Sequence, residues 1–471
     1  MPRHIHKSAI MGTDSIWRLL LRFSGPATIA MIVGSSYTIV DTIWVGRLGT
    51  DALAAITLTH PLVMILLSIV MGTGVGSASL IARRLGSGQY QEASKVASTT
   101  MTLLLIIGGL ATAITLPYLT GLLNILGASG SVLSFGQDYL YIILMFAVVE
   151  TFYMGMGHVV RAEGSPMYAS VVHIIGMLTN LVLDPILIFG WGPFPEMGIA
   201  GAATATVIAR SIGAILYIYF FVSGRSSAKF RLSNFIPRLK VLWEIYRVGL
   251  PSILRFGGFS VLMIFINRVA VGFGVTIVAV MGVIFRTNSF ARMPSLGITE
   301  GALPLIGYNY GAKNLNRVGE VFVKAMKASF IWGLLCALLA LIFPKQILSV
   351  FNSEPQFVEQ GIPAMRLFAI VYLTMGARQI PSAFFQGIGK GLPALIIGLA
   401  REYLFILPLI YILPRLMEQM GLWITFPVSD ILGAVLGLSW VLFESRRMGI
   451  RFRFFYPSKR SATEVNEVEP K

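Results

Sequence analysis

Long apolar stretches alternate with short polar ones along the whole chain. An apolar run of about 20 residues is long enough to cross a bilayer as a helix, and the sequence contains twelve such runs. They lie at residues 16–44, 53–82, 95–117, 135–159, 166–190, 199–222, 246–271, 276–306, 321–343, 361–385, 392–413 and 421–444. The pattern predicts an all-α, polytopic membrane protein with twelve transmembrane helices.

Composition supports the same class of protein. Of the 471 residues, 55% are hydrophobic and only 12% are charged, whereas soluble proteins carry about 25% charged residues. The mean hydropathy is +0.77. A single cysteine, Cys336, excludes a disulfide within the chain and a metal site built from several cysteines.

The positive charge follows the predicted topology. The formal net charge is +16, and basic residues gather in alternate connections, including Arg83–Arg84, 225–247 and the tail from Arg446 onward. The connections between those clusters hold only Arg47, Lys345 and Arg415. Because Lys and Arg accumulate on the cytoplasmic side of membrane proteins, we expect both termini in the cytoplasm and a location in the inner or plasma membrane. This distribution explains the charge without a nucleic-acid partner.

The two halves of the chain align with one constant offset, the one that places Pro251 on Pro26; we call it the repeat shift. It also pairs Gly72 with Gly297, Gly76 with Gly301, Gly86 with Gly311, and Gly164 with Gly389. Six predicted helices separate the copies, so both halves have the same orientation, as in the parallel repeats of some transporters. We therefore predict two pseudo-symmetric six-helix lobes. The predicted parts are an N-terminal lobe at 1–223, a cytoplasmic linker at 224–240, a C-terminal lobe at 241–447 and a basic cytoplasmic tail at 448–471.

Several polar residues lie within the predicted helices of the N-terminal lobe, at similar depths from the outer surface. A charge at the centre of a bilayer costs about 2.5 to 3.5 kcal/mol, so such an acid needs a cavity, a partner or a proton. The residues that converge by depth and helical spacing are Tyr37, Asp41, Tyr139, Asn180, Asp184 and Thr206.

Two carboxylates held close together do not both ionise easily, so they favour binding a proton or sharing a sodium ion. We predict that Asp41, Asn180, Asp184 and Thr206 form this proton or sodium site, with the amide and hydroxyl supplying neutral oxygen ligands. The alternative is that Asp41 and Asp184 only hydrogen-bond to hydroxyls and hold helices together.

Other intramembrane charges suggest gate contacts or structural ion pairs. Glu300 and Glu402 lie toward the inner ends of their helices, and Arg401 is at a similar depth. The Gly-rich segment at 72–76 is not followed by the Lys-Ser or Lys-Thr of a phosphate-binding loop, and no enzymatic constellation stands out. We therefore predict a protein that is not an enzyme, needs no cofactor and draws on an ion gradient.

Six segments together resemble the prokaryotic branch of the multidrug and toxic compound extrusion (MATE) family. They are VDTIWVGRLGTDALAA (40–55), GTGVGSASLIARRLG (72–86), RAEGSPMYA (161–169), LVLDPILIFG (181–190), EGALPLIGYNYGAKN (300–314) and FFQGIGKGLPAL (384–395). The resemblance implies two six-helix lobes around a central cleft, and antiport of cationic or amphipathic compounds against protons or sodium. It also associates the positions of Tyr37, Asp41, Tyr139, Asn180, Asp184 and Thr206 with cation binding and export.

The sequence thus predicts a multidrug efflux antiporter, which we expect to work as a monomer in the lipid bilayer on organic cations or amphipathic drugs. One alternative is a flippase for lipid-linked saccharides, which would favour a strongly cationic cleft; Arg255, Arg268 and Arg292 keep it open. A second alternative is a channel or a membrane scaffold, against which the repeated lobes argue.

Overall fold

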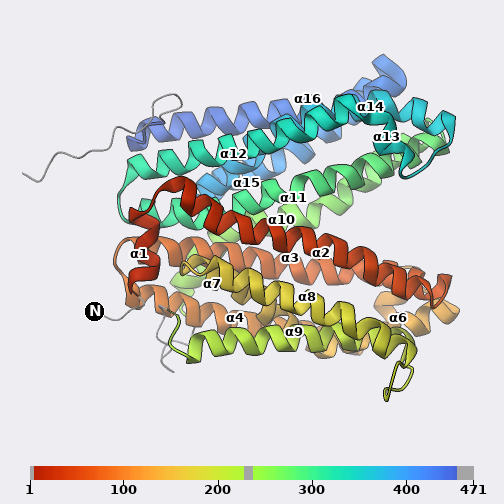
Figure 1. The fold of residues 1–471 in the computed structure, drawn as a ribbon, viewed down its shortest axis with the longest axis horizontal. Coiled ribbons are helices and arrows are strands. Elements are labelled where there is room, and N and C mark those ends of the chain that lie inside the picture. The colour runs from red at the N-terminus through yellow and green to blue at the C-terminus, as the bar shows by residue number, and fades with distance from the viewer. Residues whose placement is uncertain (1–4, 227–236, 453–471) are drawn as a thin grey trace, which may run out of the picture.

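The first half of the molecule consists of long helices that cross it and shorter ones that connect them (Figure 1). The computed structural model describes residues 5–226 and 237–452, and those ranges contain helices and no strand. The helices of this half are α1 (Ile5–Thr13), α2 (Ile16–Gly46), α3 (Thr50–Gly86), α4 (Tyr90–Thr115), the 3₁₀ turn η1 (Leu116–Tyr118), α5 (Leu119–Ile125), α6 (Gly130–Met145), α7 (Ala147–Ala162), α8 (Pro166–Phe189) and α9 (Gly198–Val222). Helices α6 and α7 form one bent crossing, with an angle of 58° at the break.

The second half repeats this arrangement. Its helices are α10 (Leu239–Val271), α11 (Val275–Gly311), α12 (Leu315–Ile342), α13 (Pro344–Ser349), α14 (Pro355–Gly387), α15 (Gly391–Leu399), the π-helical turn η3 (Ala400–Ile406) and α16 (Leu407–Met448). Met417 and Glu418 leave helical geometry inside α16, where Glu418 has a φ of 51°. This break separates the eleventh crossing from the twelfth.

Length and apolarity alone identify seven membrane-spanning helices in the described ranges, or eight if the bent α6–α7 pair is one span. One of the seven, Gly391–Met448, has 58 residues and contains the break that divides it into two crossings. The remaining crossings are α10, α11 and α14, which carry internal arginines such as Arg255, Arg292 and Arg378. The prediction of an all-α protein with twelve helices in two lobes is consistent with this architecture.

The repeat shift relates helix boundaries as well as glycines. It carries the start of α3, Thr50, onto the start of α11, Val275, and the end of α3, Gly86, onto the end of α11, Gly311. The same shift relates the starts of α4 and α12, α5 and α13, α6 and α14, and α8 and α15. Helices α2 and α10 each contain a proline of the repeat, and the paired glycines at 164 and 389 both have a positive φ. The two halves are therefore structural repeats.

The repeated glycines allow the two lobes to approach backbone to backbone. A Cβ atom added at Gly86 would lie 1.9 Å from the carbonyl oxygen of Tyr308, and one added at Gly311 would lie 2.0 Å from that of Arg83. The repeat shift carries Arg83 onto Tyr308, so the two contacts are related by the repeat. The glycines at 72 and 297 make a second such pair, with side chains of α10 and α2. Small residues permit this close packing between membrane helices.

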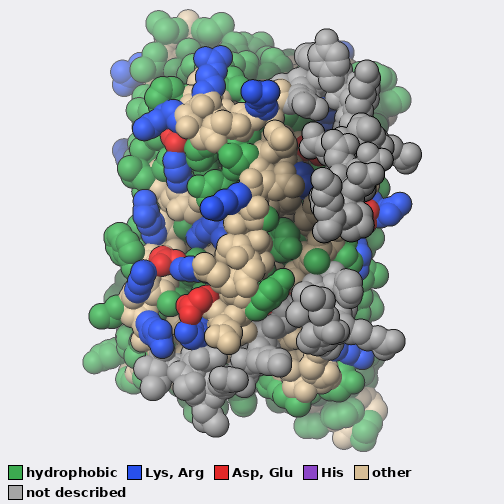
Figure 2. Space-filling view, turned by 90° about the vertical axis from the view of Figure 1, so that its left-hand side faces the viewer, with side chains coloured by type: hydrophobic (Ala, Val, Ile, Leu, Met, Phe, Trp, Pro, Cys, Tyr) green, Lys and Arg blue, Asp and Glu red, His purple; other side chains and the backbone are tan. Residues whose placement is uncertain are grey.

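Basic side chains of the described residues gather at one end of the molecule (Figure 2). We call it the basic end; it contains α1 and the connections at 87–89, 163–165, 312–314 and 388–390 (Figure 1). Figure 2 shows Lys and Arg side chains spread across this face. Most of the predicted linker and tail, residues 227–236 and 453–471, lies outside the described ranges. Helix α10 begins at Leu239, two residues before the predicted C-terminal lobe.

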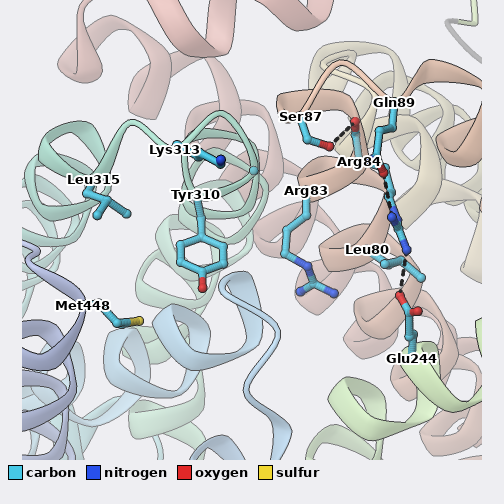
Figure 3. A pocket seen from close by; sticks show the side chains of 11 residues that line it. Leu80, Arg83, Arg84, Ser87, Gln89, Glu244, Tyr310, Lys313, Leu315 and Met448 are labelled. Carbon is cyan, nitrogen blue, oxygen red and sulfur yellow. Dashed lines mark hydrogen bonds and ion pairs between the residues drawn. The ribbon is translucent and has the colours of Figure 1, made fainter.

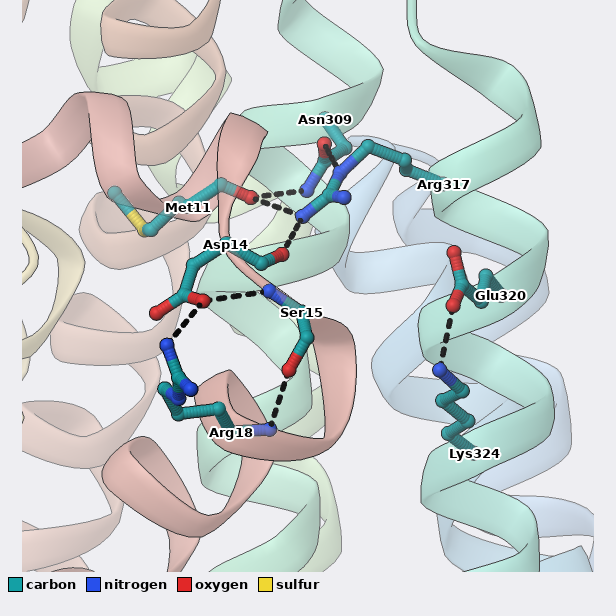
Figure 4. A network of polar contacts seen from close by, with 8 residues as sticks. All are labelled: Met11, Asp14, Ser15, Arg18, Asn309, Arg317, Glu320 and Lys324. Carbon is teal, nitrogen blue, oxygen red and sulfur yellow. Dashed lines mark hydrogen bonds and ion pairs between the residues drawn. The ribbon is translucent and has the colours of Figure 1, made fainter. Parts of the chain in front are cut away.

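Helix α1 is tied to the C-terminal lobe at the basic end (Figure 4). Arg317 of α12 donates hydrogen bonds to the carbonyl oxygens of Asp14, at 2.7 Å, and Met11, at 3.3 Å. Asn309 of α11 also donates to the Met11 carbonyl, at 3.0 Å, and accepts from Arg317 Nε at 3.1 Å. The chain that precedes α2 is thus held by the opposite lobe.

Candidate functional site

Helices α2 and α8 bring the two predicted acids of the N-terminal lobe together. Both helices run away from the basic end, and a Cβ added at Gly34 of α2 would lie 2.6 Å from Met177 Cε of α8. Asp41 and Asp184 follow these two residues by seven positions, about two helical turns, on the facing sides. Their carboxyl groups lie within electrostatic range of one another.

Asn180 completes the centre of this site. It lies one turn before Asp184 on the same face of α8, and its Nδ2 donates a 2.6 Å hydrogen bond to Asp184 Oδ1. Asn180 and Asp184 are buried, at 3% and 0% exposure, and Asp184 Oδ2 accepts no hydrogen bond from the described residues. An amide, two adjacent carboxyl groups and an open oxygen suit a proton or a small hard cation.

The other predicted members of the site lie at different distances from the acids. Tyr139 of α6 is within electrostatic range of both Asp41 and Asp184. Thr206 of α9 is half-buried and makes no hydrogen bond to either carboxyl group in the described part of the chain. The side chain of Tyr37 lies outside the described residues. The structure thus groups Asp41, Asn180, Asp184 and Tyr139, and leaves the roles of these residues as predictions.

A second polar network adjoins this group, and the sequence alone did not reveal it. Arg210 Nε of α9 lies 3.1 Å from Glu150 Oε2 of α7, and both side chains are largely buried. The Arg210 guanidinium lies 4.9 Å from the centre of the Tyr153 ring, and the Tyr153 hydroxyl is 2.8 Å from His173 Nδ1. Glu150 and Arg210 are both within electrostatic range of Tyr139, which links the network to the two acids.

Glu300 joins the two lobes. Its Oε2 lies 3.5 Å from His158 Nδ1 and 3.9 Å from Arg161 Nη2, both on α7 of the N-terminal lobe. These three residues line a small cavity between α7 and α11. The geometry fits a gate contact as well as a structural ion pair.

Arg401 and Glu402 lie inside the C-terminal lobe, with a partner that the sequence did not suggest. Arg401 Nε forms a buried ion pair with Asp430 of α16, and Arg401 Nη1 lies 3.7 Å from Glu402 Oε1. Asp430 is fully buried. It was missed because its helix is apolar around it and nothing in the spacing connects it with Arg401.

A cavity of about 600 Å³ opens between the lobes at the basic end (Figure 3). Arg83, Arg84 and Glu244 line it on one side, and Tyr310 and Lys313 on the other. Arg84 Nη2 forms a 3.2 Å ion pair with Glu244 across the lobe boundary. The cavity is therefore bordered by contacts that join the lobes, and not by the two acids of the N-terminal lobe.

No group of three or more His, Cys, Asp or Glu side chains suitable for a metal occurs in the described ranges. Two adjacent carboxyl groups are instead suited to a proton or one small cation. Two repeated lobes with charged residues inside their helices are typical of a membrane transporter.

A family model, MatE, matches residues 26–186 and 251–412, one segment in each lobe, so the chain belongs to the MatE family. It is 27% identical over 437 residues to the multidrug export protein MepA of Staphylococcus haemolyticus, covering 90% of this chain and 93% of that protein. These matches confirm the predicted family.

Solved structures share the fold. An outward-facing multidrug resistance MATE family transporter of the MOP superfamily matches with a TM-score of 0.87 and 28% identity, over 94% of this chain and 98% of that chain. A MOP superfamily transporter from Pyrococcus furiosus, whose binding pocket has a reverse polarity that suggests a different function, matches with a TM-score of 0.87 and 29% identity. The coverage is again 94% of this chain and 98% of that chain.

Proposed function

We propose that this protein exports cationic or amphipathic small molecules across the cell membrane in exchange for protons or sodium ions. The observation that carries the proposal is the group formed by Asp41, Asn180 and Asp184 within one lobe of a MatE-family fold. Loading this group with one positive charge changes the charge of a buried site, and it thereby biases the packing of α2 against α8.

Alternating access would follow from a change in the angle between the lobes. In the conformation described here, the glycine contacts, the Arg84–Glu244 pair and the Glu300 contacts all join the lobes in the half toward the basic end. We propose that the basic end faces the cytoplasm because Lys and Arg gather there, and that both termini are cytoplasmic. The conformation would then be closed to the cytoplasm.

We also propose that the basic surface contacts anionic lipid and not nucleic acid. Because one chain contains both lobes, we propose that the protein works as a monomer.

Efflux of a fluorescent cationic dye from cells tests the proposal. Asp41→Asn and Asp184→Asn should each abolish efflux driven by the ion gradient, because neither amide can load and release the charge. Asp138→Asn is the matched control, since Asp138 is an exposed acid of the same lobe. Wild-type efflux in both site variants would refute the mechanism. In proteoliposomes, efflux under separately imposed sodium and pH gradients identifies the coupling ion.

A flippase for lipid-linked saccharides is a second candidate, favoured by arginines inside the C-terminal lobe. Arg255 and Arg292 lie there, whereas Arg268 is exposed in the last turn of α10 and does not join them. The solved relative from Pyrococcus furiosus has a binding pocket of reverse polarity that suggests a different function, and this supports considering the candidate. Accumulation of a lipid-linked saccharide in a deletion strain, without any change in dye efflux, would support this candidate.

A further inference from the structure

The interior of the C-terminal lobe contains a cluster of charged side chains around Arg401. Arg401 and Glu402 lie in η3, where the helix widens to π geometry, and Arg401 pairs with the buried Asp430. Turns of π-helix occur frequently at functional sites. Glu402 Oε2 and Asp430 Oδ2 are buried and accept no hydrogen bond from the described residues.

Two more arginines adjoin this pair from neighbouring helices. Gln379 Nε2 of α14 donates a 3.3 Å hydrogen bond to Ser295 Oγ of α11, which brings the two helices together at this level. Arg378 directly precedes Gln379, and Arg292 lies one turn before Ser295. Both guanidinium groups are within electrostatic range of Arg401, Glu402 and Asp430. Their Nε atoms are buried without a hydrogen-bond acceptor, and neither side chain has an ion pair among the described residues.

Arg255 approaches the same region from α10. A Cβ added at Gly258, one turn further along α10, would lie 2.1 Å from the hydroxyl of Tyr403 in η3. Arg255 is within electrostatic range of Glu402 and of Glu300, but Glu300 is already engaged by the other lobe. Four arginines therefore lie within electrostatic range of Glu402, and three of them, Arg292, Arg378 and Arg401, also lie within range of Asp430.

An excess of positive charge inside a membrane protein is costly unless an anion accompanies it. Guanidinium groups also match the planar oxygens of carboxylates, sulfonates and phosphates. The N-terminal lobe has the opposite balance, because Asp41, Asp184 and Glu150 lie there with Arg210.

We propose that Arg292 and Arg378, with Arg255 and Arg401, bind an anionic group of the transported molecule. The substrates then include amphipathic anions and zwitterions as well as cations. The inference rests on the proposed function in one respect, namely that the substrate is an amphipathic small molecule. The occupant is identified by its chemistry, a carboxylate, sulfonate or phosphate, which a substrate or a lipid headgroup could supply.

A matched pair of dyes tests the charge preference directly. The dye 8-anilinonaphthalene-1-sulfonate and the uncharged N-phenyl-1-naphthylamine share one ring system and differ by the sulfonate. Binding of each is measured to the purified full chain in phosphatidylcholine nanodiscs, with empty discs subtracted. Arg292→Gln and Arg378→Gln should each weaken binding of the sulfonate dye about tenfold, while the uncharged dye stays within about twofold.

Three controls make the result specific. Arg268→Gln removes an exposed arginine of the same lobe and should change neither dye. Arg292→Lys and Arg378→Lys keep the charge but lose the planar guanidinium, so each should weaken sulfonate binding less than the corresponding Gln variant does. Binding of this intermediate strength excludes misfolding as the cause of the loss. Equal weakening of both dyes by the Gln variants, or unchanged sulfonate binding, would overturn the proposal.

A lipid arm separates the two sources of the anion. If phosphatidylglycerol in the nanodisc displaces the sulfonate dye from the wild-type chain, a lipid headgroup occupies the site, and the substrate assignment fails. If the dye remains bound, the substrate assignment holds. Efflux by the Asp41 and Asp184 variants tests the antiport mechanism, whereas sulfonate binding by the Arg292 and Arg378 variants tests this site, so failure of the one and failure of the other are distinguishable.

Discussion

At the scale of single residues, the N-terminal lobe contains two different kinds of buried polar pair. Asp41 and Asp184 share a site that Asn180 partly satisfies, whereas Glu150 and Arg210 neutralise each other at 3.1 Å. A buried carboxylate with a cationic partner stays charged, and one beside another carboxylate exchanges its proton or counter-ion. This difference in partner explains why we propose the coupling role for the Asp41–Asp184 pair and not for the Glu150–Arg210 pair.

The Glu150–Arg210 pair provides a prediction for stability. Glu150→Gln and Arg210→Gln should each lower the free energy of unfolding by about 2 kcal/mol, because each leaves a largely buried charge without its partner. The double variant should lose less than the sum of the two single losses. Thermal unfolding in detergent measures all three, with the exposed Asn124→Ala as a control. Additive losses would show that the two side chains do not interact.

The residues of this lobe also show what the sequence could predict. Asp41, Asn180 and Asp184 were predictable because an acid in an apolar helix is conspicuous and a spacing of four places two residues on one face. The partner of Arg210 was not predictable from the sequence. Helices α7 and α9 are apolar around most of their circumference, so packing, and not a polar pattern, sets the rotation of each helix. Asp430 was missed as the partner of Arg401 for the same reason.

At the scale of helices, the repeat is carried by small residues at the lobe boundary. Periodicity and the repeat shift predicted the twelve crossings, but not the bend between α6 and α7 or the π-helical turn η3. The counterpart of the bend, in α14, is continuous. Such differences arise from side-chain packing within each lobe, which a hydropathy pattern does not encode.

Gly311→Ala provides a prediction at this scale. The added Cβ would lie 2.0 Å from the Arg83 carbonyl oxygen, so the lobes must separate at the basic end, at a cost of about 1–3 kcal/mol to the closed arrangement. Spin labels at Ser223 and Arg446, exposed residues of opposite lobes at the basic end, report the separation in a Cys336→Ser background. We expect a larger population at long distance.

Gly109→Ala is the control for this substitution, because nothing lies within 4 Å of the added atom. In a helix interior it should stabilise the fold slightly and leave the distance distribution unchanged. A distribution for Gly311→Ala identical to that of the control would mean that the close contact is not needed to close the basic end.

At the scale of the whole molecule, the helical scaffold is duplicated, whereas the charged residues inside the lobes are not. The repeat shift pairs Asp41 with Ile266, Asp184 with Leu409 and Arg401 with Gly176. Each lobe therefore carries charged residues at positions where the other lobe has an apolar or small residue. The N-terminal lobe is rich in buried acids, and the C-terminal lobe is rich in buried arginines. In the proposed mechanism a cleft between the lobes would present charges of both signs to a substrate. The shared glycines allow the lobes to meet in a two-fold related way.

The ion pair between Arg84 and Glu244 offers a test of how the lobes close. Arg84→Glu and Glu244→Arg each replace an attraction at 3.2 Å by a repulsion. Because both side chains are about 30% exposed, the pair itself contributes roughly 0.5–1 kcal/mol. With the Ser223 and Arg446 labels, each single variant should move the equilibrium toward the arrangement open at the basic end by about fivefold.

The exchanged double variant, Arg84→Glu with Glu244→Arg, should recover most of the closed population because it restores the attraction. Recovery will be incomplete, since Arg84 also donates a 2.6 Å hydrogen bond to Gln89 that glutamate cannot donate. If dye efflux depends on the balance between the two arrangements, its rate should fall in both single variants and rise again in the exchanged one. Single variants that leave the distance distribution unchanged would show that the glycine contacts alone hold the basic end closed.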